Sequence, residues 1–220
     1  MTNSRPLILA HGGAGLRGLT PAQATCLADA LVIGYAILEQ GCPAVIAVEC
    51  TIGLLEQSGL FNAGRGANRQ LDGVQRMDAA IMEGAHLKAG AVASIEGIVH
   101  PITAARMVME DTNHVLLVGP PATRFAQHGQ LELLPKARPT RRSAGRSPTS
   151  KAAAQTMRLY RAMLKSKRTQ RDRYGTVGAV ALDRSGTVAA GASTGGIDSM
   201  LPGRVGDSPL IGCGVYADNQ

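Results

Sequence analysis

The stretch "RYGTVGAVALD", residues 173–183, joins a long basic segment to a short apolar run. The runs "TVGAVALD" (176–183) and "TVAAGAST" (187–194) are separated by the turn residues "RSG", which predicts a β-hairpin. Gly175 and Thr176 stand at its start. Glycine commonly ends a loop and threonine favours strands, so one interpretation of this step is simple punctuation.

A second interpretation of the same step is chemical. If the bond between Gly175 and Thr176 is cut, the Thr176 hydroxyl becomes a nucleophile and its own α-amine can act as the base. An α-amine has a pKa of about 7.7–8.0, so a neutral form is available near physiological pH. Glycine before the threonine can adopt strained torsions because it lacks a Cβ. The five histidines are scattered, and no Ser-His-Asp arrangement is evident.

Periodicity upstream of this stretch predicts alternating strands and helices. Thr20 and Pro21 are typical of a helix start, and Gly41 of its end. We expect helices over 21–41, 43–59, 101–111 and 121–129 and strands over 6–10, 74–84, 87–97 and 114–119, with a glycine-rich loop at 60–73. Together with the hairpin, this predicts a layered protein with a mostly antiparallel sheet.

Charge is distributed unevenly along the 220 residues, although the net charge is +7. Residues 136–173 hold thirteen Lys and Arg and a single acid, Asp172, so the rest of the chain has a net charge of −5. A basic tract can bind nucleic acid, but Tyr160 is its only aromatic residue, which gives little base stacking. We therefore expect a solvated linker over 129–174, helical at most in its middle, and no nucleic-acid partner.

The cysteine pattern and the apolar runs bear on the compartment. Cys26, Cys42, Cys50 and Cys213 lack C-x-x-C spacing, which is typical of reduced cysteines that bind no metal. The sequence has no run of about 18 apolar residues that would predict a membrane span, and its N-terminal apolar run is too short for a secretory signal. A cytoplasmic protein is expected.

Polar residues after the hairpin are arranged to bind an amino acid. Thr194 ends the second strand, and Arg204 and Asp207 follow in a loop bounded by glycine and proline. An arginine can hold an α-carboxylate with two hydrogen bonds, and an aspartate can hold an ammonium. A surface ion pair on a turn is the alternative.

The motifs "HGGAG", "LFNAGRGA", "MDAAIMEG", "KAGAV", "GTVGAVALD", "STGG" and "GRVGDSPLIG" stand in the order found in one enzyme family. Over residues 7–125 and 174–219 the chain resembles the plant-type L-asparaginase/isoaspartyl peptidase family of N-terminal nucleophile hydrolases. The resemblance implies an α+β fold, the αββα sandwich, which we expect to be incomplete in this chain. It also implies self-cleavage into segments 1–175 and 176–220, which stay together as an αβ heterodimer that pairs with a second one.

The resemblance further implies roles for individual residues in an amidohydrolase that acts on β-aspartyl dipeptides and L-asparagine without a catalytic cofactor. Thr176 would be the nucleophile, Thr194 its hydrogen-bond partner, and Asn62 a brace. Arg204 and Asp207, with Val205 and Gly206 between them, would bind the substrate's α-carboxylate and α-amine. A structural sodium ion would be held by the main-chain carbonyls of Leu55, Glu56, Ser58, Phe61, Ala63 and Arg65.

Related families and the C-terminus leave alternatives open. Glycosylasparaginases resemble "GRVGDSP", but usually carry Asp before the nucleophile and Asn at the first glycine of "STGG". Gly175 and Gly195 therefore favour the isoaspartyl peptidase branch, with taspase-like proteases more remote. The family has a Gly-Thr-Gly oxyanion segment beyond "YADN", whereas this sequence stops at Gln220. We therefore expect a truncated chain that is weakly active, or a non-catalytic, unprocessed binding protein.

Overall fold

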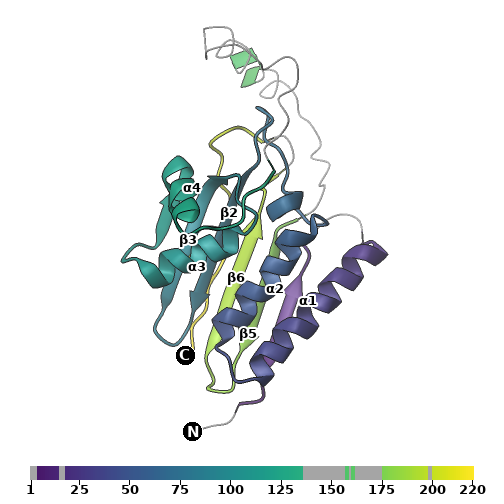
Figure 1. Ribbon diagram of the computed structural model, residues 1–220, viewed down its shortest axis with the longest axis vertical. Coiled ribbons are helices and arrows are strands. Elements are labelled where there is room, and N and C mark those ends of the chain that lie inside the picture. Colours follow the sequence, from purple (N-terminus) through teal and green to yellow (C-terminus); the bar gives the residue numbers. More distant parts are fainter. Residues whose placement is uncertain (1–3, 15–17, 136–156, 159, 162–174, 198–199) are drawn as a thin grey trace.

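The structure is a computed structural model, shown in Figure 1. It describes residues 4–14, 18–135, 157–158, 160–161, 175–197 and 200–220. Most of the predicted basic linker, including its expected helical middle, lies outside these residues.

Six strands form one sheet in the order β1-β5-β6-β2-β3-β4. Their bounds are Leu7–His11 (β1), Arg76–Glu83 (β2), Lys88–Glu96 (β3), Leu116–Val118 (β4), Val177–Leu182 (β5) and Val188–Thr194 (β6). All neighbours pair antiparallel except β3 and β4. The predicted hairpin is therefore confirmed, and it lies between β1 and β2. As a result, the segments on either side of Gly175–Thr176 share one sheet.

Four longer helices accompany the sheet: α1 (Pro21–Glu39), α2 (Ala44–Ser58), α3 (Pro101–Asp111) and α4 (Gly119–His128). Thr20 caps α1 in a capping box with Gln23, which confirms the predicted start. Gly59 ends α2 with φ 69°, a left-handed conformation that glycine adopts without strain. The glycine-rich loop after α2 contains only a short 3-10 turn, Gly64–Gly66.

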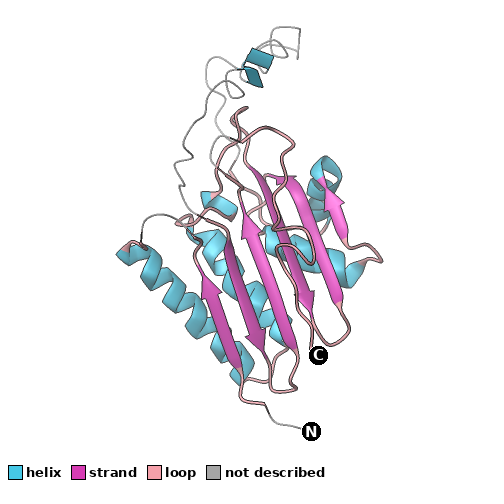
Figure 2. Cartoon of the chain, turned by 180° about the vertical axis from the view of Figure 1, so that it is seen from behind, coloured by secondary structure: helices cyan, strands magenta, loops and turns pink. Residues whose placement is uncertain are grey.

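The two faces of the sheet differ. On the helical face, alternate residues such as Met77, Ala79 and Ile81 join the main core with α2 and α3. Figures 1 and 2 show the helices on this side only. On the second face, Ala80, Met82 and the intervening residues of β6 form a smaller cluster with Val215 and Ala217 of the C-terminal segment. The described residues thus build one α layer and one β layer, consistent with the α+β class.

Helix α1 is long and apolar enough to cross a membrane, by length and composition alone. The sequence analysis expected no membrane span because scattered Asp, Glu and Gln residues interrupt the apolar run. The mean hydropathy of this helix is nevertheless 1.4, within the range of membrane spans. In the structure α1 lies along α2 and β1. One such helix near an N-terminus is weak evidence for a span.

Candidate active site

Thr176 directly precedes β5, on the second face of the sheet. Val177 pairs with Ser193, and this antiparallel register, continued by one residue, sets Thr176 opposite Thr194. Val177 belongs to the core on the helical face, so the alternation of side chains turns Thr176 the other way. The register of β2 with β6 then places Asp78 beside Thr194. Thr176 and Thr194, two predicted site residues at opposite ends of one hairpin, are thereby cross-strand neighbours, and Asp78 joins them from β2.

The Gly175–Thr176 bond lies against the turn that follows β1. Gly13 has φ 111°, and a Cβ there would come within 2.6 Å of the Gly175 carbonyl oxygen. A Cβ on Gly175 would lie 2.5 Å from the main-chain nitrogen of Ala14. The two backbones are therefore in close contact, and this packing requires glycine at both positions.

His11, at the end of β1, lies against the main chain of Thr176, a position that the sequence reasoning missed. It pairs across the sheet with Gly178, where a Cβ would lie 2.4 Å from its Nε2. Burial of part of the ring lowers the pKa of His11, although a hydrogen bond to the main chain of Thr176 acts in the opposite direction. The lowered pKa favours the neutral ring at pH 7. The signal available in the sequence was its place in "HGGAG".

The two threonine hydroxyls have different partners. Thr176 Oγ1 lies 3.4 Å from Oγ of the buried Ser208, a residue that the sequence reasoning also missed although it stands next to Asp207. Thr194 Oγ1 accepts a hydrogen bond from the Gly196 N–H at 3.0 Å. A direct hydrogen bond between Thr176 and Thr194 stays a prediction.

Asn62 is fully buried and fixes the segment that follows Thr194. Its Oδ1 accepts from the Asn68 N–H at 2.9 Å, and its Nδ2 donates to the Gly196 carbonyl at 2.5 Å. Its own carbonyl accepts from the Gly195 N–H at 2.8 Å. A Cβ on Gly195 would lie 2.4 Å from Asn62 Oδ1, so an asparagine does not fit there without rearrangement.

The predicted substrate clamp lies on the loop between β6 and Ser208. The half-buried Arg204 folds back so that its Nη1 would be 3.0 Å from a Cβ on Gly206, and it lies 3.9 Å from Met200 Sδ. Val205 is half-buried and Asp207 is exposed. Among the described residues Arg204 makes no ion pair with Asp207, so the structure gives no support to a surface ion pair.

The loop expected to hold sodium runs from the last turn of α2 to Arg65. Carbonyls of Leu55, Phe61 and Ala63 accept hydrogen bonds from Ser58 Oγ, Ala63 N and Gly66 N at 2.7, 2.9 and 3.1 Å. A carbonyl has two lone pairs, so a carbonyl that accepts one hydrogen bond can also coordinate a cation. These oxygen donors fit a hard cation such as sodium. In the described part of the chain, no group of three or more His, Cys, Asp or Glu side chains could hold a metal ion.

The Glu56 side chain lies on the other side of the sheet from Thr176. It is fully buried, and its Oε1 accepts from the Ile102 N–H at 3.1 Å. Burial raises the pKa of Glu56, and the His100 ring, 3.4 Å away, and the Ser193 hydroxyl partly offset this. This carboxyl therefore connects α2, the start of α3 and β6.

Comparisons with known proteins identify the family of the chain. The family model described as Asparaginase matches residues 4–220. The isoaspartyl peptidase of Salmonella typhimurium is 41% identical over 226 residues, covering 98% of this chain and 71% of that protein. The isoaspartyl peptidase/L-asparaginase of Danio rerio is 37% identical, covering 98% and 67%. The plant-type L-asparaginase of Pyrococcus horikoshii is 40% identical, covering 96% and 70%. The chain belongs to the asparaginase family that includes these isoaspartyl peptidases and plant-type L-asparaginases.

Proposed function

We propose that this chain is an amidohydrolase that cleaves β-aspartyl dipeptides and L-asparagine, with Thr176 as its nucleophile after self-cleavage. One observation carries the proposal: the Gly175–Thr176 bond opens a central strand and lies against Gly13, with Ser208 and Thr194 beside the threonine. The names of the relatives support the choice of substrates. The backbone around Gly175 and Gly195 is packed too closely for the Asp and Asn that glycosylasparaginases usually carry at these positions, which favours the isoaspartyl peptidase branch.

Self-cleavage would follow from the chemistry of a hydroxyl beside its own peptide bond. Thr176 Oγ1 attacks the Gly175 carbonyl carbon, the C–N bond breaks, and the nitrogen takes a proton to become the α-amine of Thr176. Water then hydrolyses the resulting ester, which releases the Gly175 carboxylate. Gly13 would hold the carbonyl in place through its contact with Gly175.

The same hydroxyl would then act on substrate. The free α-amine of Thr176 takes the hydroxyl proton as Oγ1 attacks the side-chain amide, and the amine or ammonia leaves. Water hydrolyses the β-aspartyl ester and frees the threonine. Arg204 would hold the α-carboxylate and Asp207 the α-amine, so that the amide carbon is presented to Oγ1.

Three further features belong to this proposal. A sodium ion on the carbonyls of residues 55–65 would stiffen the loop that carries Asn62. The two segments would remain associated as an αβ unit because β5 and β6 pair with β1 and β2. We also propose pairing of two such units and a cytoplasmic location.

Mass spectrometry and a turnover assay test the proposal together. Incubation of the purified 22.8 kDa chain should give two fragments that meet at Gly175/Thr176. The cleaved protein should hydrolyse β-aspartyl-leucine and L-asparagine, and α-aspartyl-leucine should not be a substrate. An intact chain without turnover would contradict the proposal and favour a non-catalytic family member.

A further inference from the structure

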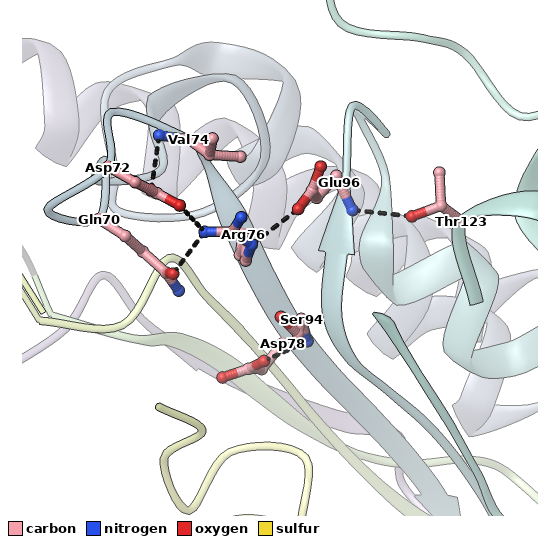
Figure 3. A network of polar contacts seen from close by, with 8 residues as sticks. All are labelled: Gln70, Asp72, Val74, Arg76, Asp78, Ser94, Glu96 and Thr123. Atoms are coloured by element: carbon pink, nitrogen blue, oxygen red, sulfur yellow. Dashed lines mark hydrogen bonds and ion pairs between the residues drawn. The ribbon is translucent and has the colours of Figure 1, made fainter. Parts of the chain in front are cut away.

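Asp78 is a buried carboxyl beside the candidate site. It lies on β2, is 3% exposed, and is the cross-strand neighbour of Thr194. Figure 3 shows its side chain directed away from the Arg76 network that joins the start of β2 to β3. Aspartate is rarely buried unless its carboxylate is paired, so its partners indicate its purpose.

A β-bulge holds one oxygen of this carboxyl. Met77 pairs with Ile95 and Ala79 with Val92, so Ala93 and Ser94 together oppose Asp78. Ser94 has φ 53°, an unusual conformation for a residue with a side chain. Its N–H donates to Asp78 Oδ1 at 2.8 Å (Figure 3). The bulge thus fixes the carboxyl in one orientation.

The second oxygen of this carboxyl is left without a direct partner. Asp78 Oδ2 is buried and, among the residues that the structure describes, makes no hydrogen bond of standard geometry. Burial raises the pKa of Asp78, while the N–H groups of Ser94 and Gly206 and the positive charge of Arg204 offset part of this rise. Gly206 in turn lies under the Arg204 guanidinium. Asp78, Gly206 and Arg204 are therefore near neighbours.

We propose that Asp78 is a positioning residue that sets the Arg204 clamp for the substrate's α-carboxylate. Its carboxylate would accept from the Gly206 N–H and its negative charge would orient the Arg204 guanidinium, whose N–H groups stay available for the ligand. An arginine held in this way loses little freedom when the ligand binds. This inference rests on the proposed function, in which Arg204 binds the α-carboxylate.

Asp78→Asn is the sharpest variant because it preserves shape and the acceptor for the Ser94 N–H. Its amide would turn two donors toward the Gly206 N–H and Arg204. We expect KM for L-asparagine and the Kd of L-aspartate to rise roughly 10–100-fold, with kcat changed less than about threefold and self-cleavage retained. Asp72→Asn removes the same charge from the nearby partner of Arg76 and should change neither constant. An unchanged KM and Kd would overturn the inference.

A double-mutant cycle tests whether Asp78 acts through Arg204. If it does, L-aspartate should bind the Asp78→Asn/Arg204→Ala protein within about threefold of Arg204→Ala alone. If the two substitutions instead weaken L-aspartate binding by factors that multiply, Asp78 does not act through Arg204.

A crystal structure of Asp78→Asn separates this inference from the proposed function. If the wild-type chain neither binds L-aspartate nor turns over substrate, the proposed function fails on its own. The inference still requires that Arg204 and Gly206 shift in the variant while the Ser94 bulge stays in place. An unmoved Arg204 would overturn it regardless of activity.

Discussion

The two faces of the sheet are built from the same strands, yet they have opposite character. On the helical face, alternate side chains such as those of Val177, Ala79 and Ile81 are buried beneath the helices. The second face takes the residues between them, among them Thr176, Thr194 and Asp78. Because side chains alternate along a strand, a shift of one residue in register would exchange the two sets.

The buried carboxyls show the same contrast. Glu56, on the helical face, contacts the first turn of α3, His100 and Ser193, all of which are structural groups. Asp78, on the second face, is close enough for the Gly206 N–H and the positive charge of Arg204 in the proposed clamp to affect its pKa. We infer that buried polar groups stabilise the fold on one side and orient reacting groups on the other. Variants on each face should therefore affect different properties.

Thr176→Ala should have the largest effect, and only on chemistry. We expect both self-cleavage and hydrolysis to be lost, because a methyl group cannot attack a carbonyl. The free energy of unfolding should change little, since Thr176 is only half-buried. Mass spectrometry of the purified variant and a turnover assay check the first expectation, and chemical denaturation the second.

Thr187→Ala is the matched control. Thr187 lies in the turn of the same hairpin, and its substitution by alanine removes the same hydroxyl group. It should leave cleavage and turnover intact. Cleavage at residue 175 in the Thr176→Ala protein would show that another group is the nucleophile.

Ile52→Ala should have the opposite effect, on stability alone. Ile52 is fully buried in α2, and its Cδ1 lies over Gly191 of β6. Truncation should cost about 2–5 kcal/mol of unfolding free energy, measured by denaturant titration. Turnover per folded molecule should stay near the wild-type value. A large fall in kcat for the folded variant would mean that the two faces are coupled.

Glu56→Gln should change how stability depends on pH. The folded-state pKa of Glu56 is raised, so above pH about 4.5 the unfolded chain releases its proton first. This carboxyl's contribution to stability is therefore full below that pH and is lost as pH rises toward the folded pKa, by at most about 1.4 kcal/mol per pH unit. Denaturation from pH 4 to 8 should show this fall in the wild type and a flatter curve in the variant. Equal curves would mean that Glu56 does not titrate in this window.

Much of the fold was predictable because local signals agreed with one another. Thr20, Pro21 and Gly59 mark helix ends by their backbone chemistry, and "RSG" marks the hairpin. The position of that hairpin between β1 and β2 was not predictable from the spacing of residues. The place of the hairpin depends on contacts between segments about 105 to 175 residues apart, which periodicity does not encode.

The site was predictable where a residue's chemistry is unusual for its position. A threonine after glycine at a strand start and an Arg-x-x-Asp pair in a loop indicated Thr176, Arg204 and Asp207. Asp78 and Ser208 were missed, because an aspartate or a serine in a short motif also fits a surface position. Only the register with β6 and the path of the C-terminal segment reveal that both are buried beside Thr194 or Thr176.

Val180→Ala should have the smallest effect and tests the comparison most directly. Val180 is 49% exposed on the second face, whereas Val177, three residues earlier on β5, is fully buried on the helical face. We expect a loss of no more than about 0.5 kcal/mol for Val180→Ala and of about 1.5–3 kcal/mol for Val177→Ala, measured side by side by denaturant titration. The substitutions remove the same atoms from the same strand, so their difference reports burial alone. Equal losses would mean that the second face is covered in solution, and dilution during the titration would reveal whether a second copy of the chain covers it.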